Sequence, residues 1–257
     1  MSFSVPRARL SIGVTGLLLA LSPAMTAHAL TPPRIGVLKG DGGALVKEGG
    51  LSTPWVTENN DVKQVVVAGD RIGVLKADGS AFVKEGGLSA AWVHENDDVK
   101  QLALSGDRIG VLKASGAALV KEGGLSATWV TESTNVKQLV LAGDRIGVLQ
   151  ASGAAFVKEG GLSATWVHEN DDVIELALAG NRIGVLKGGG SAFVKEGGLS
   201  ATWVHENDHV IQVTLAGDRV GVVKGNGDAL VKEGGLSASW VLENRSVKRL
   251  DLASGTD

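Results

Sequence analysis

The chain has no cysteine and no tyrosine, and aromatic residues make up only 4% of its 257 residues. Without cysteine there is no disulfide bond, so packing alone must hold the fold together. A cysteine nucleophile is excluded for the same reason. Glycine occurs 37 times, and this abundance indicates short strands joined by tight turns.

The first 29 residues differ from the rest of the chain. Arg7 and Arg9 precede an apolar run from Leu10 to Leu21, and a small-x-small triplet ends at Ala29. This order is typical of a secretory signal peptide, and the apolar run is shorter than the ~20 residues that span a bilayer. We therefore expect residues 30–257 to be exported as a secreted, extracellular protein without membrane insertion.

The exported part carries a mildly acidic charge. Without Arg7 and Arg9, 23 of the 25 basic residues remain against 28 acidic ones, a net charge near −5. Nucleic acids and anionic membrane surfaces select for basic patches, so the balance argues against both as partners. Neutral sugars, cations and proteins stay open as ligands.

An internal repeat of 37 residues organises this part of the chain. Each unit opens on an arginine, in "RIGV" or "RVGV", and contains one tryptophan. The six units start at Arg34, Arg71, Arg108, Arg145, Arg182 and Arg219. Because they fill nearly all of residues 30–257, we expect one domain, with no linker and no second domain.

Four short strands are predicted in each unit. In the second unit they are "RIGVLK" (71–76), "AFVKE" (81–85), "WVHE" (92–95) and "VKQLALS" (99–105), separated by glycine and Asn/Asp turns. Several strands are apolar at consecutive positions, as in "VVVAG", which is typical of strands buried on both faces. No segment has the period of a helix.

Six four-stranded units with both sheet faces covered predict an all-β, six-bladed β-propeller. The connection "EGGLSxxW" is the longest in a unit, so we place the boundary between blades there. One blade is then split, with two strands from residues 240–252 and two from residues 34–48. Pairing of these N- and C-terminal strands would close the ring and hide most strand edges.

Two other architectures use similar units. A pair of β-trefoils would consume six units, but no boundary follows the third unit. An open β-solenoid would need polar caps at its ends, and the terminal units look like the middle ones. The propeller is therefore favoured over both.

The order of motifs within the units resembles a known family. "W-V-x-E", "V-K-Q-L", "G-D-R-I-G-V" and "V-K-E-G" follow one another as in the tectonin and tachylectin type of six-bladed lectin repeat, and the resemblance covers all six units. It implies a secreted or surface-acting propeller that binds carbohydrate, including microbial cell-surface glycans, at several equivalent sites. The chain departs from the family at Ile72, Ile109 and Ile146, where a tryptophan often precedes "G-V".

The motif "KEGGLSxxWVxE" is the best candidate for such sites, because it stays constant while the glycine turns drift between units. Its lysine and glutamate would hydrogen-bond sugar hydroxyls, and its indole face would stack on a sugar ring. The candidate carbohydrate-binding residues are Lys47, Glu48, Trp55, Lys84, Glu85, Trp92, Lys121, Glu122, Trp129, Lys158, Glu159, Trp166, Lys195, Glu196, Trp203, Lys232, Glu233 and Trp240.

Each of these residues also has a structural interpretation. The tryptophan would then be a wedge between blades, and the lysine and glutamate would form salt bridges between blades. The arginine after "GD" indicates turn chemistry plus a structural ion pair. His94, His168 and His205 follow the tryptophan–valine pair in only three units, and sixfold symmetry would hold them too far apart to share a metal.

The repetition also argues against enzymatic activity. A catalytic site needs a singular acid–base constellation, whereas nearly every polar residue here recurs in equivalent surroundings. No "GxSxG", "HExxH" or phosphate-binding loop is present. We therefore expect no enzyme, no catalytic residue, no cofactor and no metal site.

Three functions remain. The main hypothesis is a multivalent lectin, whose weak equivalent sites would reinforce one another between blades on a polysaccharide or cell-surface glycan. The first alternative is a protein-interaction propeller, which would use positions that differ between blades. The second is a structural domain without a small ligand.

Overall fold

The computed structural model describes residues 32–252. All the regular secondary structure in this range is β-strand. The predicted signal peptide lies outside the described residues. Within this described part, no helix is long and apolar enough to cross a membrane.

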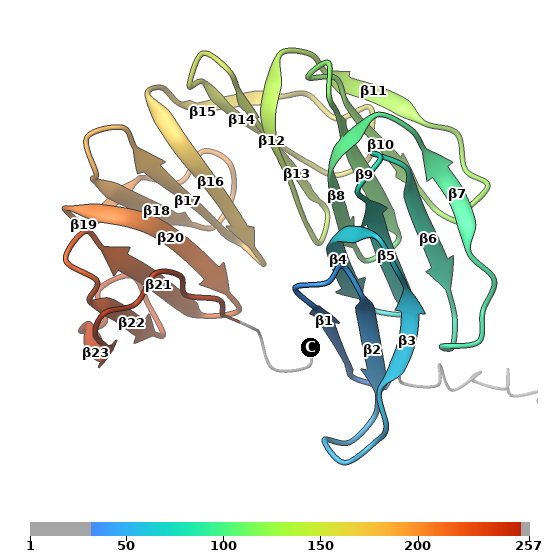
Figure 1. Cartoon of the computed structure of the whole chain (residues 1–257). Coiled ribbons are helices and arrows are strands. Elements are labelled where there is room, and N and C mark those ends of the chain that lie inside the picture. The colour runs from blue at the N-terminus through green and yellow to red at the C-terminus, as the bar shows by residue number, and fades with distance from the viewer. Residues whose placement is uncertain (1–31, 253–257) are drawn as a thin grey trace, which may run out of the picture. The chain divides into compact units, whose positions relative to one another are not determined.

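The strands form six antiparallel sheets that follow one another along the chain (Figure 1), and we call them the first to sixth blades. The first blade contains β1 (Arg34–Leu38), β2 (Ala44–Glu48) and β3 (Val56–Asn59). The second contains β4 (Val62–Ala68), β5 (Arg71–Lys76), β6 (Ala81–Glu85) and β7 (Val93–Asn96). The third contains β8 (Val99–Ser105), β9 (Arg108–Lys113), β10 (Ala118–Glu122) and β11 (Val130–Ser133).

The remaining three blades repeat this pattern. The fourth contains β12 (Val136–Ala142), β13 (Arg145–Gln150), β14 (Ala155–Glu159) and β15 (Val167–Asn170). The fifth contains β16 (Val173–Ala179), β17 (Arg182–Lys187), β18 (Ala192–Glu196) and β19 (Val204–Asn207). The sixth contains β20 (Val210–Ala216), β21 (Arg219–Lys224), β22 (Ala229–Glu233) and β23 (Val241–Asn244). The chain is a six-bladed β-propeller, as predicted.

The boundary between blades is not at "EGGLSxxW", and that prediction was wrong. The strand after Trp92 pairs with β6 of the same blade, with Val93 opposite Val83, so the connection lies inside a blade. Gly86 has a φ of 104°, and the turn that follows is closed by a 2.9 Å bond from the Ala90 N–H to the Gly87 carbonyl. Length misled the prediction, because the glycines fold this segment back onto its own sheet.

A pattern in the sequence predicts the correct pairing. Phe82 lies opposite His94 across β6 and β7, and their rings are 5.1 Å apart. Units with phenylalanine at this position have histidine opposite it, whereas units with leucine have threonine or leucine there. Because directly opposite side chains stabilise a sheet as pairs, this joint variation indicates that the two strands are neighbours.

Among residues 32–252, the first blade has three strands. The C-terminal stretch 247–252 lies against the sixth blade, where Gln212 and Leu250 exchange two hydrogen bonds of 2.9 and 2.8 Å. Within residues 32–252, no strand pairing joins this stretch to β1. The N-terminal end of the chain therefore supplies three strands of the split blade and the C-terminal end supplies one stretch, instead of the two strands predicted from each end. Closure of the ring by the two ends stays a prediction.

Each blade needs a neighbour because its sheet is apolar on both faces. Ile109, Val111 and Leu112 of β9 are all 0% exposed, and the first strands of neighbouring blades pack against one another. Gly110 interrupts this run where the next blade comes closest. A Cβ there would lie 2.9 Å from a methyl carbon of Leu139, so glycine allows close packing between blades.

This close approach predicts a specific sensitivity to a single methyl group. In Gly147→Ala, the added Cβ would lie 2.9 Å from methyl carbons of both Leu176 and Leu178. We expect the free energy of unfolding to fall by about 1–3 kcal/mol, as in other overpacked cores, measured by chemical denaturation. Gly161→Ala is the control, because nothing lies within 4 Å of its Cβ position. An equal loss in both variants would contradict the packing role.

Candidate functional site

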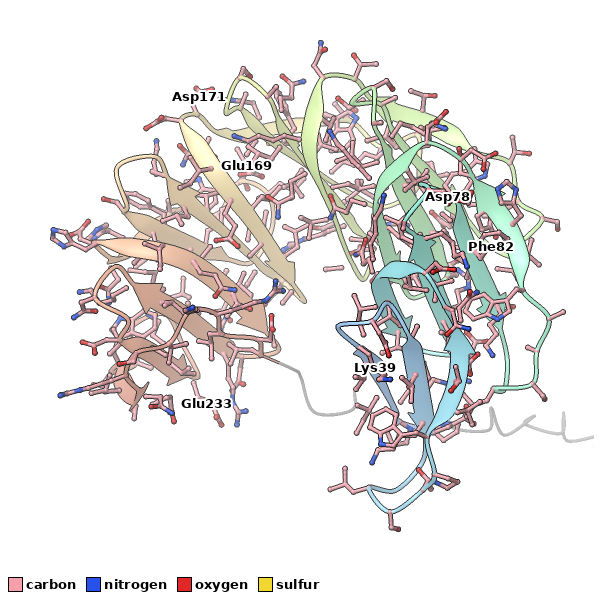
Figure 2. The ribbon with its side chains drawn as sticks, viewed as in Figure 1. Lys39, Asp78, Phe82, Glu169, Asp171 and Glu233 are labelled. Carbon is pink, nitrogen blue, oxygen red and sulfur yellow. The ribbon has the colours of Figure 1, made fainter. Side chains whose placement is uncertain are left out.

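The repeated lysine of the motif is buried between two blades. Lys84 is 1% exposed, and its ammonium lies 2.5 Å from a carboxylate oxygen of Glu58 on the preceding blade. In each such pair both side chains are at most 3% exposed, and Glu169 of one pair is labelled in Figure 2. The five pairs are Glu58–Lys84, Glu95–Lys121, Glu132–Lys158, Glu169–Lys195 and Glu206–Lys232.

The rest of the motif encloses the same ammonium group. The Lys121 ammonium donates to the carbonyl of Leu125 in the "GGLS" turn and lies 5.0 Å from the ring centroid of Trp129. Trp129 also packs against the apolar core that the second and third blades share. Blade packing thus accounts for the lysine, the turn and the tryptophan recurring together, because all three surround one buried charge.

The structure separates the candidate carbohydrate-binding residues into two groups. The lysines of the second to sixth blades are at most 3% exposed and are already bonded to carboxylates and carbonyls. The glutamates of "KEGG" remain accessible, with the Glu85 side chain 38% exposed. Trp55 is 42% exposed, whereas the other five tryptophans are half-buried. A ligand at this motif would therefore meet the indole and the outer glutamate, and a carbohydrate-binding role for them stays a hypothesis.

The arginine that opens each unit forms a second connection between blades. Arg71 makes a 2.7 Å ion pair with Glu85 on the adjacent strand, and it donates a 2.5 Å bond to the Gly123 carbonyl of the next blade. The structural ion pair predicted for this arginine is confirmed, with the "KEGG" glutamate as its partner. The corresponding arginines of the first five blades all reach the next blade in this way.

A third connection was missed in the sequence. The Gln64 side chain donates a 2.9 Å bond to the Leu102 carbonyl and accepts a 2.9 Å bond from the Leu102 N–H. The recurring glutamine of "VKQL" could have signalled it, since a repeated amide on a first strand can satisfy both groups of a facing peptide. These bonds link the first strands of successive blades.

The buried ion pairs predict a large loss of stability when one partner is removed. In Lys121→Met, the Glu95 carboxylate would remain buried without its cation, so we expect a loss of about 3–5 kcal/mol in the free energy of unfolding. Replacing both residues by apolar ones should recover much of this loss. Lys39→Met is the control, because the pair of Lys39 with Asp41 is exposed, and it should leave stability nearly unchanged. Similar losses in both single variants would contradict the buried-pair role.

At one junction between blades, a glutamate replaces the glutamine that bonds the facing peptide group. Glu175 occupies the glutamine position between the fifth and sixth blades and accepts a 2.9 Å bond from the Val213 N–H. Burial raises the pKa of Glu175, although that bond and the charge of Arg249 oppose the shift. Lys137 lines the same surface hollow as Glu175. An ionised Glu175 cannot donate to the Val213 carbonyl as a glutamine would.

The raised pKa predicts a pH-dependent junction between these blades. The folded state favours protonated Glu175, so this stabilisation is present below the ordinary pKa of glutamate and is lost as pH rises through the folded pKa. Glu175→Gln should therefore stabilise the protein by about 1 kcal/mol at neutral pH, the value of one hydrogen bond. The gain should shrink toward about pH 4, as followed by denaturation curves. Gln138→Glu should introduce the same dependence at the preceding junction, and a gain independent of pH would contradict this assignment.

The first strands also carry exposed positions whose chemistry changes between blades. The second residue of each is exposed, and Lys100 and Lys137 each reach the backbone of the next blade. Lys137, Ile174 and Ile211 line one hollow of about 430 Å³. We call this row the rim, and its members are Lys63, Lys100, Lys137, Ile174 and Ile211 on β4, β8, β12, β16 and β20, together with Lys248 at the equivalent position of the C-terminal stretch.

The histidines form small exposed pairs on the outer strands. Nε2 of His94 lies 2.9 Å from Asp97, and His168 and His205 make equivalent contacts in their own blades. Among residues 32–252, no group of three or more His, Cys, Asp or Glu side chains could hold a metal ion. Each histidine instead packs on the phenylalanine opposite it.

Known proteins are similar to this chain in fold but not in sequence. No family model and no curated protein matches it. Prp20p of Saccharomyces cerevisiae superposes with a TM-score of 0.64 at 10% identity, over 84% of this chain and 74% of that one. Human WBSCR16 superposes with a TM-score of 0.59 at 16% identity, over 76% of this chain and 70% of that one. Hsv2 of Kluyveromyces lactis superposes with a TM-score of 0.58 at 14% identity, over 75% of this chain and 67% of that one.

These likenesses support the β-propeller fold alone, because all are below 25% identity. Prp20p is yeast RCC1, and none of the three proteins is a tectonin. The tectonin type of the repeats, which rested on motif order, therefore stays a prediction.

Proposed function

We propose that the chain is an exported, non-enzymatic propeller that binds a protein partner at its rim. The observation that carries this proposal is the contrast between the two kinds of polar residue. The repeated lysines and arginines are bonded between blades, whereas the rim is exposed and changes from lysine to isoleucine around the blades. A surface that differs between blades suits one extended footprint better than several equal sites.

The rim also indicates the chemistry of the partner. Ile174 and Ile211 are 51% and 55% exposed, and adjacent exposed apolar side chains are typical of binding sites. Lys63, Lys100 and Lys137 continue the row from blade to blade. A partner segment with apolar side chains next to acidic ones would bury the former and pair with the latter.

The similar structures are consistent with this proposal. Prp20p binds Gsp1p and histones, and Kap60 was found bound to it. These facts concern a distant propeller, and they support the general use of this fold as a protein-binding platform. The repeated surroundings of the polar residues support a role without catalysis, as the sequence predicts.

A displayed peptide library selected on residues 30–257 would test the rim directly. We expect enrichment of peptides that combine acidic and apolar residues. Ile174→Thr with Ile211→Thr should weaken their binding about tenfold or more, because each buried isoleucine contributes ~1.5–3 kcal/mol. Val204→Thr is the control, since Val204 is an exposed apolar residue on the outer strand β19. Equal effects of both changes would contradict a site at the rim.

A multivalent lectin is the second candidate. It is favoured by six repeated tryptophans that solvent reaches in part, together with the resemblance of the units to tectonin repeats. A glycan array probed with the same protein distinguishes the two candidates. Glycan binding that falls in Trp166→Ala and falls further in Trp166→Ala with Trp55→Ala, without a change in the unfolding midpoint and without an effect of the rim variants, would replace the protein-binding proposal with the lectin.

A further inference from the structure

The hollow at the rim brings apolar, cationic and anionic groups of three successive blades together. It measures about 430 Å³. Binding sites typically combine an apolar lining with a few polar groups that fix the ligand's orientation. The residues that line this hollow are Lys137 and Gln138 of the fourth blade, Ile174, Glu175 and Leu186 of the fifth, and Ile211 of the sixth.

A local irregularity of β16 places an apolar and an acidic side chain in the same hollow. In a regular strand, consecutive side chains point to opposite faces. The pairing of β16 with β17 joins Val173 to Lys187 and Glu175 to Leu186, and it leaves Ile174 without an opposite residue. Such an extra residue bends the strand and redirects its side chains, so Ile174 and Glu175 both line the hollow.

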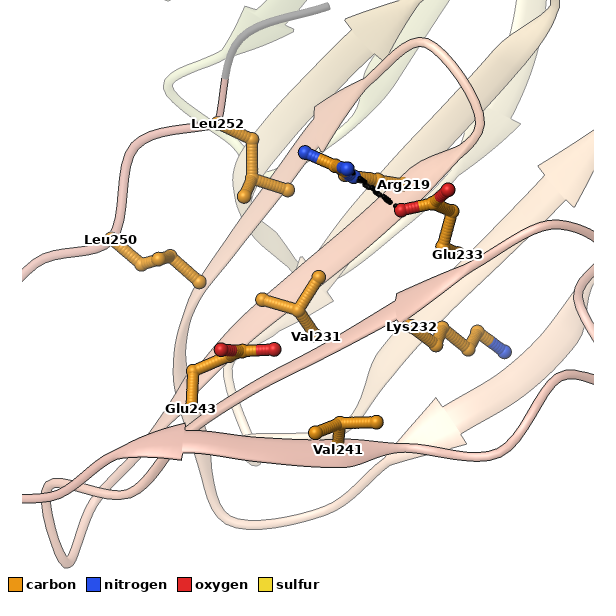
Figure 3. Close-up of a pocket in the computed structure, with 8 residues that line it drawn as sticks. All are labelled: Arg219, Val231, Lys232, Glu233, Val241, Glu243, Leu250 and Leu252. Atoms are coloured by element: carbon orange, nitrogen blue, oxygen red, sulfur yellow. Dashed lines mark hydrogen bonds and ion pairs between the residues drawn. The ribbon is translucent and has the colours of Figure 1, made fainter.

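Another hollow, of about 490 Å³ on the sixth blade, has similar groups (Figure 3) but a different explanation. Its Arg219 and Glu233 pair with each other at 2.7 Å. Val231 in its lining corresponds to Val194 of the fifth blade, which is 0% exposed and packs against the sixth blade. That hollow is therefore a blade face of the kind already described, whereas the rim is exposed on each blade that carries it.

Glu175 gives the hollow at the rim an acceptor where the other junctions have a donor. At four other positions a glutamine donates to the facing carbonyl, as Gln138 does to Leu176 at 2.9 Å. Glu175 accepts a bond from the Val213 N–H, but an ionised carboxylate has no hydrogen for the Val213 carbonyl. Two oxygen acceptors, one of them charged, are thus available to a donor that enters the hollow.

The surroundings of this carboxylate leave it short of positive charge. Burial raises the pKa of Glu175, which means that its ionised form is poorly solvated. Arg249 opposes this shift, but its guanidinium makes 3.1 Å bonds to Asp251. Lys137 donates a 3.1 Å bond to the Val173 carbonyl. A cationic donor from a ligand would supply both the charge and the hydrogen bond that the carboxylate lacks.

We propose that this hollow captures the free amino terminus of a partner segment whose first residue is apolar and whose next residues are acidic. The α-ammonium group donates to Glu175 and to the Val213 carbonyl. The first side chain packs on Ile174 and Ile211, and the acidic residue that follows pairs with Lys137. The inference rests on the proposed protein-binding function of the rim and adds which end of the partner binds.

An amino terminus fits these groups better than a lysine side chain does. In a terminal residue the cation, the apolar side chain and the next acidic residue are joined over a short stretch of chain, and the hollow presents Glu175, Ile174 and Lys137 together. A lysine carries its ammonium at the end of a four-carbon stem, which would hold the neighbouring acidic residues farther from Lys137.

The charge order along the rim sets the direction of the segment. Lys137 lines the hollow, and Lys100 and Lys63 continue the row on the third and second blades, so the acidic residues run from the fifth blade toward the second. Free amino ends are expected in the compartment to which the chain is exported, because removal of a signal peptide creates one.

Two synthetic peptides test the capture of an amino terminus. Both consist of a leucine followed by alternating glutamate and serine residues, and one of them is acetylated at its amino end. We expect residues 30–257 to bind the free peptide about tenfold or more tightly at about pH 7, because acetylation removes a charge and a charge-assisted hydrogen bond. Titration calorimetry measures both affinities.

Glu175→Gln is the variant that removes the charge while restoring the amide of the other junctions. It should bind the free and the acetylated peptide equally. Gln64→Glu is the matched control, because it places a carboxylate at a junction that has Lys63 and Lys100 in place of the isoleucines. This control should keep the tenfold preference of the unchanged protein.

Three outcomes would overturn the inference. Equal binding of both peptides by the unchanged protein would show that the rim takes acidic, apolar segments without recognising their end, and the protein-binding proposal would stand. Tighter binding of an acetylated peptide with lysine in place of leucine would assign the hollow to a lysine side chain. Binding of neither peptide would also refute the capture, and the displayed library would then decide separately whether the rim binds protein.

Discussion

A lysine and a glutamate buried together between neighbouring blades are the interaction on which this propeller depends. Both charges lie out of water, and Lys121 reaches its carboxylate partner on the preceding blade while Trp129 covers it. Apolar contact alone is not directional, so flat valine and leucine faces could slide past one another. A buried pair is satisfied in one register only, because a displaced charge would remain desolvated and unpaired.

The other polar connections extend this control across the whole blade. Gln64 fixes the first strand to the next blade through both groups of one peptide, and Arg71 fixes the far side through a glycine carbonyl. Gly73 lets the next blade's leucine side chains approach the sheet between these points. The blades are thus connected through Gln64 on the first strand, Arg71 on the second and Lys84 on the third, which explains why so many polar residues recur in every unit.

Because these polar residues connect the blades, fewer polar groups are available to bind a ligand. Groups that would hydrogen-bond a ligand are already bonded between blades, so a repeated residue is not by that fact a site residue. The exposed positions that the junctions do not need are free to vary, and Lys63 of the second blade corresponds to Ile211 of the sixth. Function in such a repeat is better sought where the units differ than where they agree.

Much of the architecture could be predicted from the sequence. The 37-residue period, the strands and the double-sided burial follow from local residue patterns, and together they predict a propeller. The blade boundary could not be found from loop length, although the joint variation of Phe82 and His94 predicts the correct strand pairing. The motif's lysine, glutamate and tryptophan were recognised as a unit, but ligand binding and blade packing use the same residue types.

The sequence by itself determined the repeat, the all-β class and which residues act together, because these depend on periodicity and local chemistry. Only the tertiary structure decided that the strands before and after Trp92 belong to the same blade, and which glutamate each lysine meets. Glu58 and Lys84 are 26 residues apart and lie on different blades. Their contact depends on how two sheets pack, and packing geometry is not written in any single stretch of the chain.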